Sequence, residues 1–167
     1  MRDIAQEISA VFDPLKELPY LFIGSGMSMR YYNLPTWENL LRALARRVHP
    51  DNPLAYETYR AAVQVQVATG PAPLPAIASR IEADFVSRWS SNTQFARELE
   101  PFSSLLKAGV SPFKIAVANH VLANSKRTND QKMADEFSCI KLLGKRSIAG
   151  VITTNYDQMA EDLFSGF

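Results

Sequence analysis

The chain has 167 residues, 47% hydrophobic and 21% charged, a balance typical of one globular domain with a single core. Its 18 lysines and arginines nearly offset 17 aspartates and glutamates, so the net charge of +1 gives no sign of a nucleic-acid partner. One cysteine, Cys139, excludes an internal disulfide and a multi-cysteine zinc site. The single cysteine fits a reducing cytoplasm, where we expect the protein to act without a metal cofactor. No stretch is as long as a membrane span, so we expect no membrane partner.

The N-terminal part of the chain is predicted to form a helix and then a strand. Residues 2–17 are predicted as an amphipathic helix, because apolar residues recur at helical spacing: Ile4, Ile8, Val11, Phe12 and Leu15. Pro19 then interrupts the chain, and the apolar run at 20–23 predicts a short buried strand. Residues 24–35, which begin with Gly-Ser-Gly, are expected to form a loop.

The middle of the chain is predicted to be mainly helical. Thr36 can cap a helix over 37–49, and the inner face of that helix is expected to carry Trp37, Leu40, Leu41 and Leu44. Two further helices are expected over 53–68 and 74–90, on either side of a proline-rich loop at 69–75. The apolar positions in phase in the second of these helices are Ile77, Ile81 and Phe85.

Two more helices are predicted before the chain returns to a strand. Ser111 and Pro112 form a good helix start, a capping serine followed by proline at the first helical position. Thr128 or Asn129 can start another helix, which Gly144 is expected to end.

A second buried strand is predicted over 147–154, and Asp157 can cap a last helix after it. Each predicted strand is followed by a loop and a helix, which is typical of an α/β fold with parallel strands. The helices of about 50–145 would then be an insertion between the two strands.

Ligands of open α/β sheets bind at the carboxyl ends of the strands, so the segments after the two strands are the candidate site. The first segment offers backbone amides and hydroxyls suited to a phosphate, from Gly24, Ser25, Gly26 and Ser28. Its spacing is neither the dinucleotide fingerprint, since position 29 is methionine, nor a P-loop. A glycine turn without a ligand remains the alternative.

The second segment places polar side chains directly after an apolar strand: Thr153, Thr154, Asn155 and Asp157. A structural role is the alternative here too, with Asp157 as a helix cap and Asn155 forming a side-chain turn. That alternative accounts well for Asp157 and less well for the Thr-Thr-Asn run.

Taken together, the sequences "GSGMS", "LPTWENLL" and "TTNYD" resemble the sirtuin-like family, and most closely its branch in bacterial anti-phage defence proteins. The family's usual motifs are Gly-Ala-Gly-Ile-Ser and Thr-Gln-Asn-Ile-Asp, each at the end of a strand. The resemblance covers residues 20–41 and 148–160 and leaves the middle of the chain unmatched.

The resemblance implies a Rossmann-like parallel sheet that binds NAD as a substrate and cleaves the bond between nicotinamide and ribose. It implies cofactor contacts from Gly24, Ser25, Gly26, Ser28 and Thr154. It makes Asn155 the catalytic asparagine, while Asp157 would hold the loop or help bind the nicotinamide side.

The sequence departs from the family pattern in two ways, which affect the expected reaction and the expected catalytic residues. The four-cysteine zinc module of protein-deacylating sirtuins is absent, so NAD hydrolysis is favoured over deacylation. The family's catalytic histidine follows the asparagine motif, whereas His49 and His120 both precede it and are expected to be structural or surface residues. The chain is therefore expected to be the N-terminal portion of the domain, with further strands after residue 167 and an exposed sheet edge that favours self-association.

Three functions follow as hypotheses. The first is an NAD hydrolase that acts in anti-phage defence by NAD depletion. The second is a non-catalytic nucleotide-binding or assembly module, which would bind NAD or an ADP-ribose-type nucleotide and pair with itself or a partner defence protein. The third is a helical interaction domain without a ligand. No acidic residue stands at a clear ribose-binding position relative to Gly24, so the choice between NAD, NADP and ADP-ribose stays open.

Overall fold

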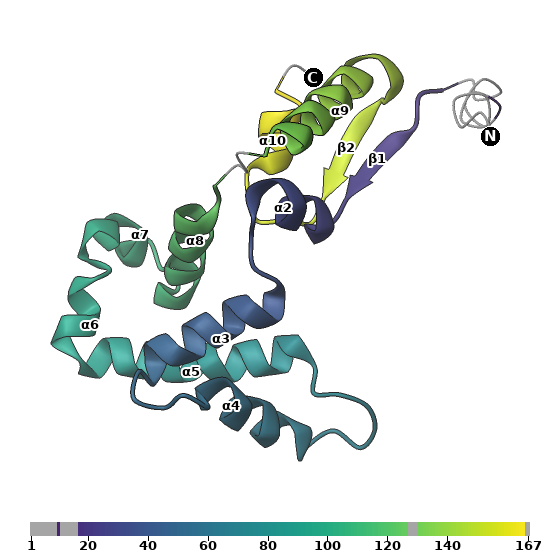
Figure 1. Ribbon diagram of the computed structural model, residues 1–167. Coiled ribbons are helices and arrows are strands. Elements are labelled where there is room, and N and C mark those ends of the chain that lie inside the picture. The colour runs from purple at the N-terminus through teal and green to yellow at the C-terminus, as the bar shows by residue number, and fades with distance from the viewer. Residues whose placement is uncertain (1–9, 11–16, 127–129, 166–167) are drawn as a thin grey trace. The chain divides into compact units, whose positions relative to one another are not determined.

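The computed structural model describes residues 10, 17–126 and 130–165 (Figure 1). The helix predicted over 2–17 therefore falls almost entirely outside the described residues, as do Thr128 and Asn129. The chain divides into two compact units. We call them the sheet unit, from the described residues of 1–33 and 127–167, and the helical unit, 34–126.

The sheet unit contains a two-stranded parallel sheet. Strand β1 (Tyr20–Ile23) pairs with β2 (Gly150–Thr153), and Ile23 lies opposite Thr153 at their carboxyl ends. Both predicted strands are confirmed, although β2 is shorter than expected. A parallel pair among helices is consistent with the α/β class.

The prediction that the strands are buried is wrong for one face of this sheet. Ile23 is fully buried, but the alternate residues Tyr20 and Phe22 are 68% and 66% exposed. Ile152 lies opposite Phe22 in the register and is also exposed. Side chains alternate between the faces of a strand, so these three residues share one uncovered apolar face.

Residues 25–32 form a helix, α2 (Ser25–Tyr32), so the loop predicted over 24–35 is wrong. The glycines of this helix disfavour helix formation, and contacts with residues distant in the sequence stabilise it. The rings of Tyr31 and Tyr32 lie 5.6 and 6.3 Å from that of Phe137, and the Tyr32 hydroxyl donates to Asp162 Oδ2 at 2.5 Å. Asn33, in the left-handed conformation at φ 53°, ends the helix.

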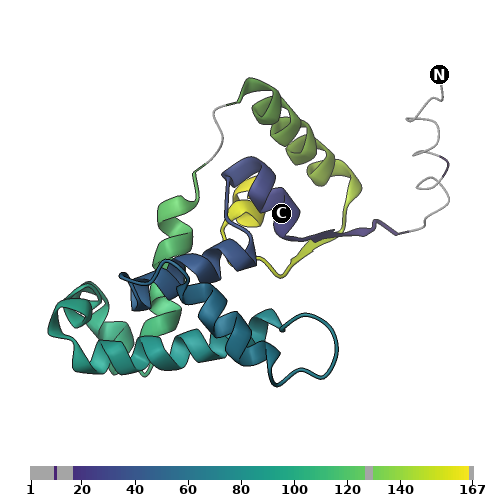
Figure 2. The ribbon, with the colours of Figure 1, turned by 60° about the horizontal axis from the view of Figure 1, so that its bottom comes forward.

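Two further helices complete the described sheet unit: α9 (Gln131–Ser147) and α10 (Met159–Leu163). The residue that caps α9 is Asp130 and not Thr128 or Asn129, because the Asp130 side chain accepts the Met133 amide at 3.1 Å. The helix continues past Gly144, so the predicted end is wrong. The N-cap residue of α10 is Gln158 and not the predicted Asp157, whose side chain still bonds the start of the helix by accepting the Met159 amide at 2.9 Å. Figures 1 and 2 both show α2 and α10 side by side.

The helical unit consists of α3 (Trp37–Val48), α4 (Ala55–Gln64), α5 (Leu74–Ser91), α6 (Thr93–Arg97), the 3-10 turn η1 (Glu100–Phe102), α7 (Ser103–Lys107) and α8 (Pro112–Asn124). Its core is built from the inner faces of α3, α4, α5 and α8. The predicted apolar phase of α5 is confirmed, since Ile77, Ile81 and Phe85 are fully buried. Helices α3, α4 and α5 are drawn against one another in both ribbon views (Figures 1 and 2).

The helix starts in this unit are mostly as predicted. Thr36 caps α3 by accepting the Asn39 amide at 3.2 Å. Ser111 and Pro112 begin α8, but the Ser111 hydroxyl donates to Glu82 Oε1 at 2.9 Å instead of capping the helix. Trp37 is 44% exposed, so its predicted place on the inner face is wrong.

The helical unit spans 34–126, compared with the helical insertion expected at about 50–145. The difference arises at both ends, because α3 packs into the helical core while α9 belongs with the sheet. Among the described residues, no helix is both long and apolar enough to cross a membrane.

Candidate functional site

The carboxyl ends of β1 and β2 lie at the same edge of the sheet, and a hydrogen bond joins the segments that follow them. Asn155 Nδ2 donates to Ser28 Oγ at 2.8 Å, across 127 positions of sequence. Ser28 is 2% exposed, and it is the buried polar residue of the described core. Two residues that the sequence analysis selected from separate segments are thus in direct contact.

The backbone around Asn155 fixes the direction of this side chain. The Asn155 amide donates to Thr153 Oγ1 at 3.1 Å, which closes a small turn directly after β2. Since Nδ2 is committed to Ser28, the Oδ1 atom is the part of this amide that can accept a hydrogen bond from water or from a ribose hydroxyl. A half-buried neutral amide held in this way can orient a reacting group without carrying charge.

Gly24 and Gly26 lie at the start of α2, but their backbones do not require glycine. Gly24 is extended, at φ −103°, and the described glycines in the left-handed region are Gly70 and Gly109. The positive φ that glycine permits is therefore not used at Gly24 or Gly26. A Cβ added at Gly24 or Gly26 would meet no atom within 4 Å. Open space above both glycines leaves room for a ligand to approach the backbone.

The first turn of α2 is also suited to an anion. Gly24 precedes the helix without a side-chain cap, and no acidic residue lies in the first turn. The amide of Met27 bonds back to the Gly24 carbonyl at 3.3 Å. Because the first amides of a helix lack partners within it, those of Ser25 and Gly26 are available to a phosphate.

Substituting Gly26 separates its role in the fold from a role in binding. We expect Gly26→Ala to raise the free energy of unfolding by about 0.5–1 kcal/mol, because alanine is the better helix former and fits the open space. The same methyl group would weaken ADP-ribose binding, as measured by calorimetry. Gly109→Ala is the control and should instead lower the free energy of unfolding by about 1–2 kcal/mol, because Gly109 has φ +84°. Unchanged binding by Gly26→Ala would exclude ligand contact at this glycine.

The other predicted site residues lie around this pair without joining it. Ser25 and Thr154 are exposed at the sheet edge. The carboxylate of Asp157 accepts the Met159 amide, so it holds the start of α10. This contact agrees with the structural reading of Asp157, and with the loop-holding role that the family resemblance implies.

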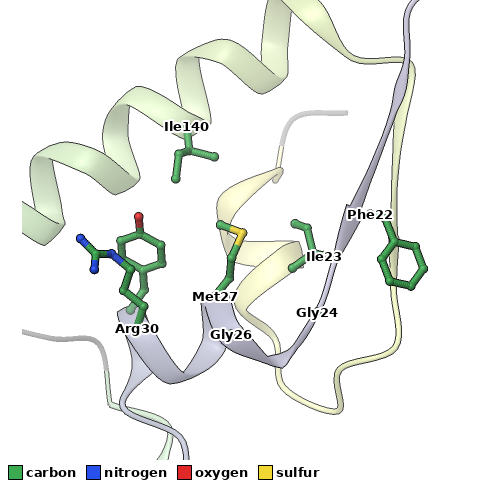
Figure 3. A pocket seen from close by; sticks show the side chains of 8 residues that line it. Phe22, Ile23, Gly24, Gly26, Met27, Arg30 and Ile140 are labelled. Carbon is green, nitrogen blue, oxygen red and sulfur yellow. The ribbon is translucent and has the colours of Figure 1, made fainter.

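A pocket of about 450 Å³ opens beside the glycine turn, between β1, α2 and α9 (Figure 3). The side chains that line it include Met27, Arg30, Tyr31 and Ile140, and none of these residues is predicted from the sequence to belong to the site. Met27, Arg30 and Tyr31 are spaced three and four residues apart, the signal of one helix face. This helical spacing was not used in the prediction, because residues 24–35 were expected to form a loop.

The Glu136 carboxylate links the pocket wall on α2 to α9. Its Oε2 atom accepts hydrogen bonds from Arg30 Nε at 3.1 Å, Arg30 Nη2 at 2.6 Å and the Tyr31 hydroxyl at 3.2 Å. The hydrogen bond from Arg30 lowers the pKa of Glu136, and the same contact raises that of the guanidinium. The carboxylate therefore stays charged at neutral pH and keeps Arg30 beside the pocket.

Both histidines of the sequence lie in the helical unit. His49 Nε2 is 2.9 Å from the Tyr59 hydroxyl, which donates to Asp84 Oδ2 at 2.6 Å. His120 is half-buried in α8, and burial lowers its pKa. These surroundings account for both histidines as structural residues.

The described residues contain no group of three histidine, cysteine or acidic side chains placed to hold a metal ion. Comparison with protein-family models, with curated proteins and with solved structures found no match to this chain.

Proposed function

We propose that the chain binds NAD and hydrolyses it, with its active site where β1 and β2 end. The observation that carries the proposal is the hydrogen bond between Asn155 Nδ2 and Ser28 Oγ. The two residues belong to the two segments that resemble the sirtuin-like motifs, and binding one dinucleotide requires such segments to meet. The parallel strand pair would then be part of a Rossmann-like sheet.

In this proposal the phosphates of NAD bind the first turn of α2, at Ser25 and Gly26. The bond between nicotinamide and ribose C1′ breaks with both electrons leaving on nicotinamide. The resulting oxocarbenium-like ribose is captured by water, which loses a proton to give ADP-ribose. Asn155 Oδ1 would orient that water or the ribose hydroxyls, and positioning of this kind can account for a large share of a rate enhancement.

By its resemblance to the defence branch, the enzyme would act in the cytoplasm by depleting the NAD of an infected cell. A non-catalytic nucleotide-binding or assembly module is the second candidate. One observation favours it: among the described residues, Tyr20, Phe22 and Ile152 form an exposed apolar face. Such a face suits a second copy or a partner protein.

Incubating the chain with NAD and separating the products by chromatography tests the proposal. We expect nicotinamide and ADP-ribose to appear in equal amounts. ADP-ribose binding without turnover would contradict the hydrolase and favour the non-catalytic module. Absence of both binding and turnover would contradict every nucleotide function for this chain.

A further inference from the structure

The pocket beside the glycine turn has three chemically different parts (Figure 3). One end is the backbone of Gly24 and Gly26, at the amino end of α2. The middle is apolar, with Ile23 and Met27 on one side and Ile140 of α9 on the other. The far end carries the guanidinium of Arg30. Phe22 also borders the pocket, but its ring points to the other side of the strands.

The order of these groups along the pocket, which runs from backbone amides through apolar side chains to a guanidinium, is suited to binding part of a nucleotide. A volume of about 450 Å³ lies in the range of small-molecule sites. An apolar middle can cover a flat base, while each end suits a negative group. Arg30 follows Gly24 by six positions, so the two ends are about 9 Å apart along the helix axis. One ligand could therefore place one phosphate at the glycines and another at Arg30.

The charge of the pocket bears on the choice between NAD and NADP. Sites that select NAD usually hold the ribose 2′-hydroxyl with an aspartate or glutamate, whereas an arginine accommodates the 2′-phosphate of NADP. Among the residues that the structure describes, those that line this pocket include Arg30 and no carboxylate. The Glu136 carboxylate is the hydrogen-bond partner of Arg30 and is not among the described lining residues.

The hydrogen bonds of Arg30 leave part of its guanidinium available. Those within the described residues start from Nε and Nη2, and both end on Glu136 Oε2. The Nη1 amino group is not used in them, and the side chain is 49% exposed. Glu136 thus fixes one side of the guanidinium and orients it, while Nη1 can donate to a phosphate oxygen.

We propose that Arg30 binds the 2′-phosphate of the dinucleotide and makes this site prefer NADP to NAD. The inference rests on the proposed function and narrows its substrate. Charge-assisted hydrogen bonds of this kind are worth roughly tenfold to a hundredfold in affinity. The preference for NADP is expected to be of that size, and to fall as salt concentration rises.

Calorimetric titration of the full chain with NADP and with NAD tests this assignment. Arg30→Gln should weaken NADP binding about tenfold to a hundredfold and leave NAD binding within about twofold. Glu136→Gln should strengthen NADP binding, since it removes the competing negative charge while its amide oxygen can still accept from Arg30 and Tyr31. Arg46→Gln, at an exposed position of α3, is the control for loss of one positive charge and should change neither affinity.

The outcomes separate the two proposals. Equal binding of NADP and NAD that Arg30→Gln leaves unchanged would overturn the NADP assignment and leave the NAD hydrolase standing. A loss of both affinities in Arg30→Gln would also overturn it, because it would show a general effect on the site. If the wild-type chain binds neither dinucleotide, the proposed function and this inference both fail.

Discussion

Asn155→Ala is expected to lower the rate of nicotinamide release at least about 100-fold while leaving dinucleotide binding within about threefold. The variant removes the amide that donates to Ser28 Oγ and that would orient the attacking water. Binding should persist, because in the proposed function the phosphates would bind at the amino end of α2 and not at Asn155. The measurement pairs single-turnover release of nicotinamide with calorimetry of ADP-ribose.

Asn124→Ala is the matched control for this variant. Its amide also donates one hydrogen bond, to the His120 carbonyl at 2.7 Å, but it lies at the end of α8 in the helical unit. It should retain wild-type turnover. Full activity in Asn155→Ala, or equal losses in the two variants, would remove Asn155 from the catalytic role.

Phe85→Ala is expected to have the largest effect on stability, lowering the free energy of unfolding by about 3–5 kcal/mol. Phe85 is fully buried in the core of the helical unit. Its ring meets those of Phe95 and Phe113 edge-on, with centroids 4.8 and 5.6 Å away. Truncation removes both aromatic contacts and leaves a cavity that the surrounding helices cannot fully close.

Denaturant unfolding followed by circular dichroism would measure this loss. Val86→Ala is the control, because Val86 is the next residue on α5 and is 37% exposed. It should cost about 1 kcal/mol or less. A loss below about 1 kcal/mol for Phe85→Ala would contradict the central place of this ring in the core.

Features set by neighbouring residues were predictable from the sequence. Thr36 caps α3, Asp157 bonds the start of α10, and Ser111-Pro112 begins α8. Each follows from groups within a few positions of one another, where spacing determines contact. The prediction of which apolar residues of α5 are buried was confirmed for the same reason.

Helix α2 was not predictable in this way. Its Gly-Ser-Gly start argues for a loop on local propensity. The contacts that favour the helix come from residues more than a hundred positions away, where Phe137 packs on the two tyrosines and Glu136 and Asp162 accept their hydroxyls. Missing α2 meant missing Arg30 and the pocket. The prediction for Trp37 was wrong for a different reason: helical periodicity shows which residues share a face and not how much of each is covered, and Trp37 is 44% exposed.

The sequence predicts the two segments of the candidate site separately. That they lie close together follows only from the general rule that ligands bind at the carboxyl ends of parallel strands. The sequence could not specify which side chains would touch. The structure places Ser28 against Asn155 and turns Asp157 toward α10. It also shows that Gly24 and Gly26 have open space beside them without a left-handed backbone, unlike Gly70 and Gly109, which combine open space with a positive φ.

The central claim is that the ends of β1 and β2 form one nucleotide site, and titrating the ¹⁵N-labelled 18.6 kDa chain with ADP-ribose tests it most directly. Amide resonances can be followed residue by residue at this size. We predict saturable shifts at Gly24, Gly26, Ser28 and Asn155, with the core amides of the helical unit as an internal reference. Saturable shifts confined to the helical unit, or no shifts at millimolar ADP-ribose, would contradict the account.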